Sequence, residues 1–211
     1  CLVASGGHSH IVVVHSYTEF EVVGRTRDDA AGECFDKAAR AMGMPYPGGI
    51  HLDKAAEGGN PHAFSFPHPR VDGNPLDFSF SGLKTAVLNL LHNARQKGEE
   101  VNRADLAASF QKTVVELLAG NLLRAAADTR AHTIVLAGGV SANSGLRRRM
   151  EADCARLGYR LYAPPLPLCG DNAAMVGAQG YYEYQSGHLA GMDLNACATM
   201  PIEGDTVRMQ G

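Results

Sequence analysis

The sequence contains no tryptophan and no apolar run approaching the roughly 18 to 20 residues that a membrane-spanning helix needs. No basic, apolar and small-residue sequence opens it as a signal peptide would. Its five cysteines are scattered, odd in number and without a CxxC pair, so they indicate neither a disulfide framework nor a zinc ribbon. From these absences we expect a cytoplasmic protein with reduced thiols and no membrane contact.

The sequence also has no large excess of charge of either sign. The 19 lysines and arginines against 22 acidic residues give a net charge of -3, so the chain as a whole has no attraction for nucleic acid. A local basic patch or a basic partner remains compatible with this balance. With 45% hydrophobic and 19% charged residues, the 211-residue chain has the composition of an ordinary globular protein of one or two domains.

What the sequence does contain is two glycine turns, each entered from an apolar run. Ser5-Gly6-Gly7 follows Leu2–Ala4 and leads into another strand-like run, and Gly138-Gly139 follows Thr133–Ala137. Paired glycines let the main chain approach a ligand without Cβ obstruction, and a helix predicted behind Asn143 adds partial positive charge. A nucleotide or phosphate would fit both turns. The alternative is that the second pair only satisfies a sharp turn in an α/β fold.

Apolar periodicity and turn residues predict an antiparallel meander of three strands, followed by helices and two further strands. The expected strands are residues 2–4, 10–15, 20–25, 133–137 (as the central strand) and 159–162. The expected helices run from a cap at Asp28 or Asp29 to about 42, then 47–56, 82–96 (capped by serines), 102–129 (capped by Asn102), 143–157 and 173–185. Residues 58–81, rich in Gly, Pro, His and Asn, predict a long loop.

The first expected helix carries Asp29, Gly32 and Asp36 on one face, because they are spaced i, i+3 and i+7. A carboxylate at Asp36 beside the small Gly32 could receive ribose hydroxyls while a ligand lies close to the helix. The alternative is a solvated carboxylate that pairs with Arg40.

Together these residues resemble the family of tRNA adenosine threonylcarbamoyltransferases, which make threonylcarbamoyladenosine next to the anticodon. The matching motifs occur in the family's order and cover nearly the whole chain. They are Val3–His8, Asp28–Lys37, Tyr46–Gly49, Asp77–Thr85, Ala137–Asn143 and Gly170–Asn172. The resemblance implies an α/β lobe of the actin-like ATPase (ASKHA, ribonuclease H-like) superfamily. It places a C-terminal nucleotide-binding lobe at residues 1–200, with a helical insertion at about 45–130, and a flexible tail at 201–211.

The implied reaction transfers the threonylcarbamoyl group from threonylcarbamoyl-AMP to N6 of adenosine 37 in tRNAs that read ANN codons. By resemblance, the phosphate or acyl end of the substrate is wrapped by Val3, Ala4, Ser5, Gly6 and Gly7. The nucleoside part is contacted by Asp36, Gly49, Asp53 and Asn143. Asp171 resembles the family's catalytic carboxylate, a ligand of one divalent metal ion, Fe2+ or Zn2+. Its alternative role is the N-cap of the final helix.

The sequence departs from the family in its metal ligands. The family takes two histidines from an HxxxH helix before the Ser-Gly-Gly strand, whereas no two of the nine histidines here are four apart. One Asp does not hold a divalent ion tightly, since such sites generally need three protein ligands. We therefore expect a C-terminal fragment that lacks its N-terminal lobe and is inactive alone. A substitute site of His8, His10 and Asp171 is the weaker expectation, behind a substrate-facing His8 and a surface His10.

The resemblance also implies tRNA as substrate, and a paralogous dimerising subunit and a small ATPase subunit as partners. The residues available for RNA contact are Arg25, Arg27, Arg40, Lys84, Arg147, Arg148 and Arg149. Two other functions stay open at this point: a non-catalytic scaffold lobe, which the missing histidines favour, and an ATP-hydrolysing or phosphotransferase relative. The block Asp77–Thr85 favours the tRNA-modifying family over the latter.

Overall fold

The computed structural model describes residues 1–69, 71–196 and 200–203. Its five strands form one sheet in the order β3-β2-β1-β4-β5. The strands are β1 (Leu2–Ala4), β2 (Ser9–Val14), β3 (Phe20–Arg25), β4 (Thr133–Ala137) and β5 (Arg160–Tyr162). The predicted meander of β1, β2 and β3 is confirmed by their antiparallel pairing. The prediction of residues 133–137 as the central strand is wrong, because β1 takes the centre and pairs in parallel with β4 on its other side.

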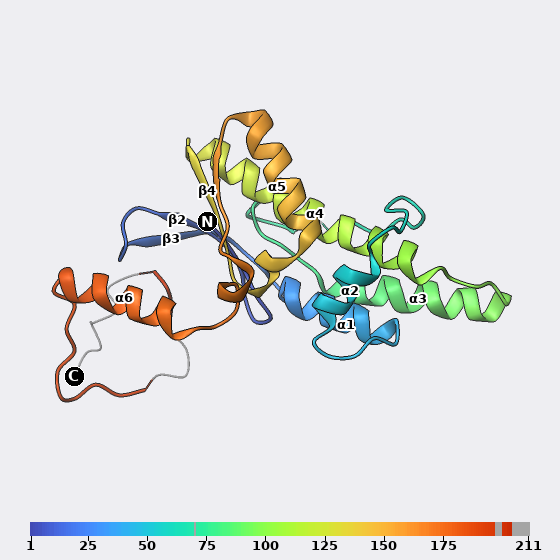
Figure 1. Ribbon diagram of the computed structural model, residues 1–211, viewed down its shortest axis with the longest axis horizontal. Helices are drawn as coiled ribbons and strands as arrows, with labels where there is room; N and C mark the ends of the chain where they lie inside the picture. The colour runs from blue at the N-terminus through green and yellow to red at the C-terminus, as the bar shows by residue number, and fades with distance from the viewer. Residues whose placement is uncertain (70, 197–199, 204–211) are drawn as a thin grey trace.

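The helices follow the predicted order, with their ends shifted by one or two residues. They are α1 (Ala31–Ala41), α2 (Gly48–Ala55), α3 (Ser81–Lys97), α4 (Arg103–Asp128), α5 (Ser144–Leu157) and α6 (Ala173–Gln185). Two short 3-10 helices, η1 (Gly139–Ala142) and η2 (Leu166–Leu168), complete the list of helices in the described ranges. In Figure 1, α1, α2 and α3 group to the right of the sheet, whereas α6 lies apart at the lower left.

The helix α4 connects the sheet with the helical group through one hydrophobic core. Asn102 caps it as predicted, its side-chain oxygen accepting hydrogen bonds from the amides of Ala104 and Asp105 at 2.9 and 3.2 Å. The buried residues that α4 and the sheet share in this core are Phe110, Val114, Leu118, Leu122, Leu2, Ile11, Ile134 and Leu136. Because Leu2 of β1 and Leu136 of β4 are buried in this core, the turns that follow these two strands start from fixed positions.

The predicted caps of α1 and α3 are wrong. The N-cap of α1 is Ala30, which makes no side-chain cap bond, and the Ser9 hydroxyl instead accepts from the amide of Ala31 at 2.9 Å. Asp28 reaches across to α3, where it accepts from the amides of Phe80 and Ser81 at 2.7 and 3.2 Å. The hydroxyl of Ser81 donates to the same carboxylate at 2.8 Å rather than capping the helix itself.

Removing this long-range cap is expected to destabilise the fold in a pH-dependent way. Burial opposes the charged form of Asp28, but hydrogen bonds from Ser79, Phe80 and Ser81 outweigh it and hold the pKa of Asp28 below its ordinary value of 3.8. A lowered folded-state pKa adds stability above 3.8 that is lost as the pH falls below that value. We expect Asp28→Ala to lower the free energy of unfolding by about 1–2 kcal/mol at neutral pH. Urea unfolding at pH 7 and pH 3 checks this, and a difference of the same size at both values would contradict it.

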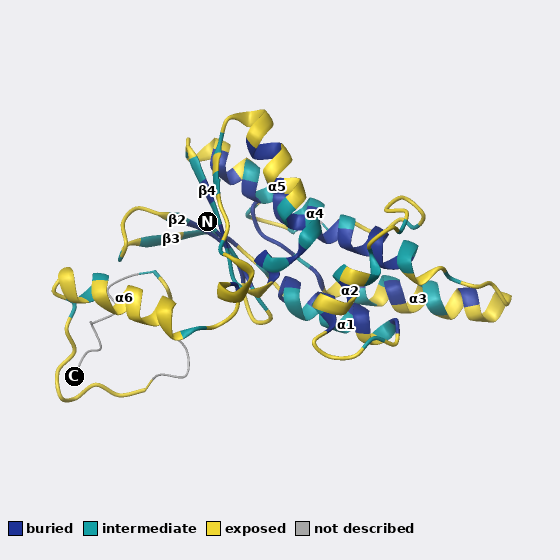
Figure 2. Cartoon of the chain, in the orientation of Figure 1, coloured by how far each residue is buried: buried dark blue, intermediate teal, exposed yellow. Residues whose placement is uncertain are grey.

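The helix α6 contributes nothing to the core, since none of its residues is buried. Figure 2 shows it as an almost wholly exposed helix beside the β2–β3 hairpin. Its contact with that hairpin is the stacked pair Tyr17 and Tyr182, with ring centroids 3.8 Å apart, and a hydrogen bond of 3.0 Å from Gln179 to the Tyr17 carbonyl. No helix in the described ranges combines the length and apolarity needed to cross a membrane. The predicted tail 201–211 lies outside the described residues from 204 onward.

Candidate functional site

The two glycine turns lie together at one edge of the sheet. Because β1 and β4 are parallel neighbours, with Leu2 opposite Leu136 and Val3 opposite Ala137, both strands end at the same edge. The turns after them are in contact: a Cβ on Gly138 would lie 2.4 Å from the Ala4 carbonyl oxygen. Gly138 has a φ of 83° and a ψ of 168°, a conformation essentially restricted to glycine. Gly138 therefore serves the turn itself, as the structural alternative proposed.

The other glycines of these turns face open space. An added Cβ on Gly6, Gly7 or Gly139 would meet no atom within 4 Å. The Ser5 hydroxyl accepts from the amides of Gly7 and His8 at 3.3 and 3.1 Å, so it shapes the first turn. Gly6, Gly7 and Gly139 are exposed, which leaves main chain at both turns accessible to a ligand.

The helix α1 packs directly on the first turn. The amide of Gly32 donates to the Ser5 carbonyl at 3.0 Å, and a Cβ on Gly32 would lie 2.6 Å from that oxygen. The small residue therefore does permit a close approach to α1, but what approaches is the main chain of the turn. This differs from the expectation that a ligand would lie against Gly32, since that space is filled.

Asp36 lies one turn further along α1 and does not pair with Arg40. Its Oδ1 accepts from the amides of Gly48 and Gly49 at 2.7 and 3.2 Å, which caps the start of α2. Its Oδ2 has no hydrogen-bond partner among the described residues, and the side chain is half-buried. Asp36 thus presents one open acceptor. The Gly49 amide, expected to contact a ligand, is already bound to Asp36.

Asp53 joins α2 to the start of α5. Its carboxylate accepts from the Ser144 amide at 3.0 Å, the Ser144 hydroxyl at 2.7 Å, the Asn143 amide group at 3.3 Å and the side chain of Gln111. Asn143 in turn caps α5 by accepting from the Leu146 amide at 2.9 Å. These bonds close a ring from the first turn through α1, α2 and α5 to the second turn.

Sequence reasoning missed Ser144 and Gln111 in this ring. Ser144 had a local signal, because it follows the helix cap Asn143 directly and carries a hydroxyl at a helix start. Gln111 had none, since it lies inside the predicted helix 102–129 and is 58 residues from Asp53 in the sequence. Only the packing of α4 against α2 brings these two side chains together.

Asp171 lies outside this ring, in the segment before α6. The N-cap of α6 is Asn172, whose side chain accepts from the Met175 amide at 3.0 Å, so the alternative role of Asp171 as a cap is wrong. Asp171 is exposed and makes no hydrogen bond or ion pair within the described ranges. Asp171 therefore has no structural role among the residues that the structure describes.

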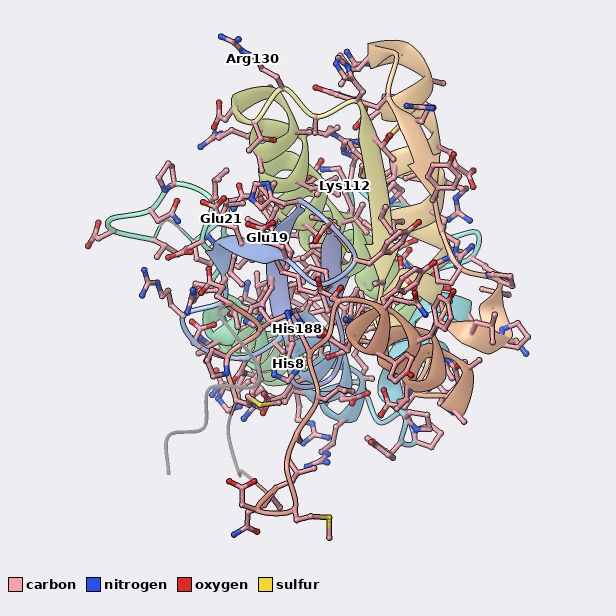
Figure 3. All side chains as sticks on the ribbon, turned by 90° about the vertical axis from the view of Figure 1, so that its left-hand side faces the viewer. His8, Glu19, Glu21, Lys112, Arg130 and His188 are labelled. Carbon is pink, nitrogen blue, oxygen red and sulfur yellow. The ribbon has the colours of Figure 1, made fainter. Side chains whose placement is uncertain are left out.

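Asp171 does not complete a metal site with other residues of this chain. No group of three or more His, Cys, Asp or Glu side chains among the described residues could hold a metal ion. His8, labelled in Figure 3, lies in the turn just before β2, and its ring centroid is 5.4 Å from that of His10. These two histidines adjoin each other, but the substitute site with Asp171 does not form.

A cavity of about 600 Å³ lies elsewhere, between α2, α4 and α5. Its lining includes Lys112, Glu116, Arg148 and Glu57, so charges of both signs alternate around it. Lys112 and Glu116 pair with each other at 3.2 Å. Of the residues with an expected function only Arg148 and Arg149, expected to contact RNA, line this cavity, and we assign no ligand to it.

Most of the arginines expected to contact RNA bind within the chain. Arg25 pairs with Glu203 at 3.3 Å, Arg27 with Asp77 at 2.5 Å, and Arg149 with Asp153 at 2.5 Å. Arg147 donates to the Ser141 carbonyl at 2.7 Å. Among the described residues, Arg147 forms hydrogen bonds but no ion pair, whereas Arg40, Lys84 and Arg148 form neither an ion pair nor a side-chain hydrogen bond.

Comparison of the sequence with known proteins gives a consistent match. The family model described as tRNA N6-adenosine threonylcarbamoyltransferase matches residues 1–178. Proteins of that name from Clostridium botulinum (strain 657 / Type Ba4) and Moorella thermoacetica are 50% identical over 202 residues and 53% identical over 201 residues. These matches cover 96% and 95% of this chain but 59% of each relative. The chain thus spans less than two thirds of the length of the relatives it matches.

Comparison with solved structures shows the fold. Full-length HypF in a phosphate- and nucleotide-bound form superposes with a TM-score of 0.62 at 15% identity, over 86% of this chain and 33% of HypF. HypF from T. kodakarensis superposes with a TM-score of 0.52 at 22% identity, over 75% of this chain and 20% of that protein. The α/β lobe therefore has the actin-like ATPase fold, as expected. With its glycine turns and the family match over residues 1–178, the chain belongs to the tRNA N6-adenosine threonylcarbamoyltransferase family.

Proposed function

We propose that this chain is the adenylate-binding part of an enzyme that transfers the threonylcarbamoyl group from threonylcarbamoyl-AMP to N6 of adenosine 37 in tRNAs that read ANN codons. The observation that carries the proposal is the ring of contacts around the two glycine turns. It leaves Gly6, Gly7 and Gly139 open, and on α1, which packs on the first turn, one oxygen of Asp36 has no partner among the described residues. The chain covers 59% of its relatives, so we propose that the remainder of the enzyme completes the site and that this part is inactive alone.

The roles follow from the chemistry of each group. Exposed main chain at the turns, close to helix N-termini, suits the phosphate and acyl end of the substrate, with Val3 and Ala4 holding the first turn in the sheet. The open Oδ2 of Asp36 suits a ribose hydroxyl. Gly49, Asp53 and Asn143 then act mainly by fixing that carboxylate and the start of α5.

Transfer is an acyl-type substitution at the carbamoyl carbon. N6 of adenosine forms the new C–N bond and loses a proton, and the bond from the carbamoyl carbon to the phosphate oxygen breaks. AMP leaves with the electron pair. Main-chain N–H groups at the turns would stabilise the charge that develops on the leaving phosphate. Holding the adenylate in one orientation contributes further, because the incoming amine then meets a correctly placed carbon.

We also propose that Asp171 is a catalytic carboxylate and one ligand of a divalent Fe2+ or Zn2+ ion whose other ligands lie outside this chain. Such an ion would polarise an oxygen of the substrate. The described residues do not fit a complete metal site, so no step above is assigned to the ion. As partners we propose tRNA, a paralogous dimerising subunit and a small ATPase subunit, in the cytoplasm.

A phosphotransferase or ATP-hydrolysing activity is the second candidate. The structurally similar HypF was solved in a phosphate- and nucleotide-bound form, and this chain superposes on 33% of that protein. The likeness is at 15% identity and carries the fold alone. Turnover of ATP without transfer to tRNA would favour this candidate over the first.

The adenylate proposal is tested by calorimetric titration of the 211-residue chain with a non-hydrolysable threonylcarbamoyl-adenylate analogue. We expect Asp36→Asn to weaken binding about 10- to 100-fold, the range for one hydrogen bond to a charged acceptor. Asparagine can keep Oδ1 on the amides of Gly48 and Gly49, so the variant removes the open acceptor while retaining the cap of α2.

The matched control is Glu33→Gln, one turn earlier on α1, where the carboxylate pairs with Lys37 at 2.9 Å. We expect this variant to bind like the wild type. Equal affinity of Asp36→Asn and the wild type would remove Asp36 from the site. Absence of binding by the wild-type chain would count against the adenylate proposal and in favour of a scaffold lobe.

A further inference from the structure

The segment that carries Asp171 is attached to the body of the protein at few points. Between Ala155 and Ala196, Cys169 is the only buried residue. After β5 ends at Tyr162 the described residues form no further strand, and the amides of Leu168 and Cys169 donate only to Pro165 and Leu166 of the same segment. Beyond Asp171, the next contacts with the body are those of Gln179 and Tyr182 with Tyr17. The position of the chain just before Asp171 therefore depends on what holds Cys169.

Arg147 holds it. From the first turns of α5, its Nε donates to the Ser141 carbonyl in η1 at 2.7 Å. Its Nη2 donates to the Pro164 carbonyl at 2.6 Å and to the Cys169 sulfur at 3.2 Å. The planar guanidinium thus bridges the second glycine turn and the Asp171 segment, which a single ammonium group cannot do with the same geometry.

No carboxylate competes for this guanidinium. Arg147 forms no ion pair among the described residues, unlike its neighbour Arg149, which pairs with Asp153 at 2.5 Å. Its charge is met by carbonyl oxygens and a thiol of two separate segments. The side chain is half-buried, so these bonds lie partly out of water and are stronger than those of an exposed arginine.

We propose that Arg147 is a positioning residue, which fixes Asp171 relative to the glycine turn after β4. Asp171 lies two residues beyond Cys169, a span of at most about 7 Å of extended chain, so anchoring Cys169 restricts where the Asp171 carboxylate can lie. The functional part of this inference rests on the proposed transfer reaction. The anchoring itself concerns only this chain and is tested without that reaction.

The anchoring is tested by alkylating the 211-residue chain with iodoacetamide and following each cysteine by peptide mass spectrometry. We expect Arg147→Met to raise the labelling rate of Cys169 at least about tenfold, because loss of hydrogen bonds from a charged donor lets the buried thiol reach the reagent by local opening. The matched control is Arg148→Met, because Arg148 is exposed and contacts neither segment. We expect that variant to label Cys169 at the wild-type rate.

Buried Cys34 reports whether the fold stays intact, since burial raises the pKa of its thiol to about 12 and keeps it unreactive. An unchanged Cys169 rate in Arg147→Met, with Cys34 still protected, would overturn the anchoring. If Cys34 also becomes reactive, Arg147→Lys replaces that variant, because it retains the charge but not the two-sided bridge. A wild-type Cys169 rate in Arg147→Lys would then overturn the proposal.

The functional part is tested in a chimera that joins this chain to the part of the Moorella thermoacetica relative that it leaves uncovered. We expect Arg147→Met to lower kcat about 10- to 100-fold while KM for threonylcarbamoyl-AMP changes less than about twofold. A raised KM with unchanged kcat would contradict positioning of Asp171. A wild-type chimera that binds the adenylate but transfers nothing would refute the proposed function, and the labelling result would still decide the anchoring.

Discussion

We expect Gly138→Ala to lower the free energy of unfolding by about 3 kcal/mol or more relative to the wild-type chain. The backbone there lies in a region essentially restricted to glycine, which costs a substituted residue about 1–3 kcal/mol. The added Cβ would also lie 2.4 Å from the Ala4 carbonyl oxygen, and forcing an extra methyl into packed structure costs about 1–3 kcal/mol. Urea unfolding followed by far-ultraviolet circular dichroism measures the difference, since the chain has no tryptophan to report it.

Gly139→Ala is the matched control for this variant. An added Cβ on Gly139 meets nothing within 4 Å, so we expect its free energy of unfolding to stay within about 1 kcal/mol of the wild type. If the exposed main chain of Gly139 contacts the ligand, Gly139→Ala should instead weaken binding of the adenylate analogue. A stability change of less than about 1 kcal/mol in Gly138→Ala would show that the β1 and β4 turns are not in contact as the structure places them.

The Asp171→Ala variant is expected to lose transfer activity about 100- to 1,000-fold, the range seen when one group that acts in the transition state is removed. Asp171 is exposed and makes no hydrogen bond or ion pair within the described ranges, so its removal should not change stability. Because Asp171 lies outside the ring of contacts around the two glycine turns, we expect binding of the analogue to the 211-residue chain to change less than about twofold. Transfer is measured in the Moorella thermoacetica chimera with unmodified tRNA.

The control for this variant is Asp128→Ala, which removes an equally exposed carboxylate at the end of α4. We expect it to transfer at the wild-type rate. Unchanged turnover in Asp171→Ala would remove Asp171 from the mechanism and with it the proposed metal ligand. A loss of adenylate binding that matches the loss of transfer would instead make Asp171 part of the nucleotide site.

Local signals in the sequence predicted the elements of the fold well. Apolar runs, glycine pairs and helix caps act between residues close in the chain, so Asn102 and Asn143 capped their helices as predicted. The three-strand meander followed from the same signals, because short turns pair neighbouring strands. The family resemblance rested on motifs in a fixed order, which a sequence displays directly.

Contacts between distant segments were decided by tertiary structure. Asp28 was predicted to cap the helix that follows it. It caps α3 instead, because packing brings the amide nitrogen of Phe80 within 2.7 Å of its carboxylate. Asp36 was expected to meet a ligand or Arg40, and the structure divides its oxygens between the start of α2 and open space. Arg147 was one of three consecutive arginines available for RNA, yet the return of the chain after β5 places the Pro164 carbonyl 2.6 Å from it.

By itself, the sequence determined that this chain folds as an α/β lobe with two glycine turns and belongs to a tRNA-modifying family, because those properties depend on residue type and short spacing. Only the tertiary structure decided which carboxylates have structural duties and which remain available. A carboxylate accepts hydrogen bonds from whichever donors the packed core brings near it, even when those donors are distant in the sequence. Asp28 and Asp53 are thereby committed to caps, whereas one oxygen of Asp36 and the whole of Asp171 remain open for chemistry.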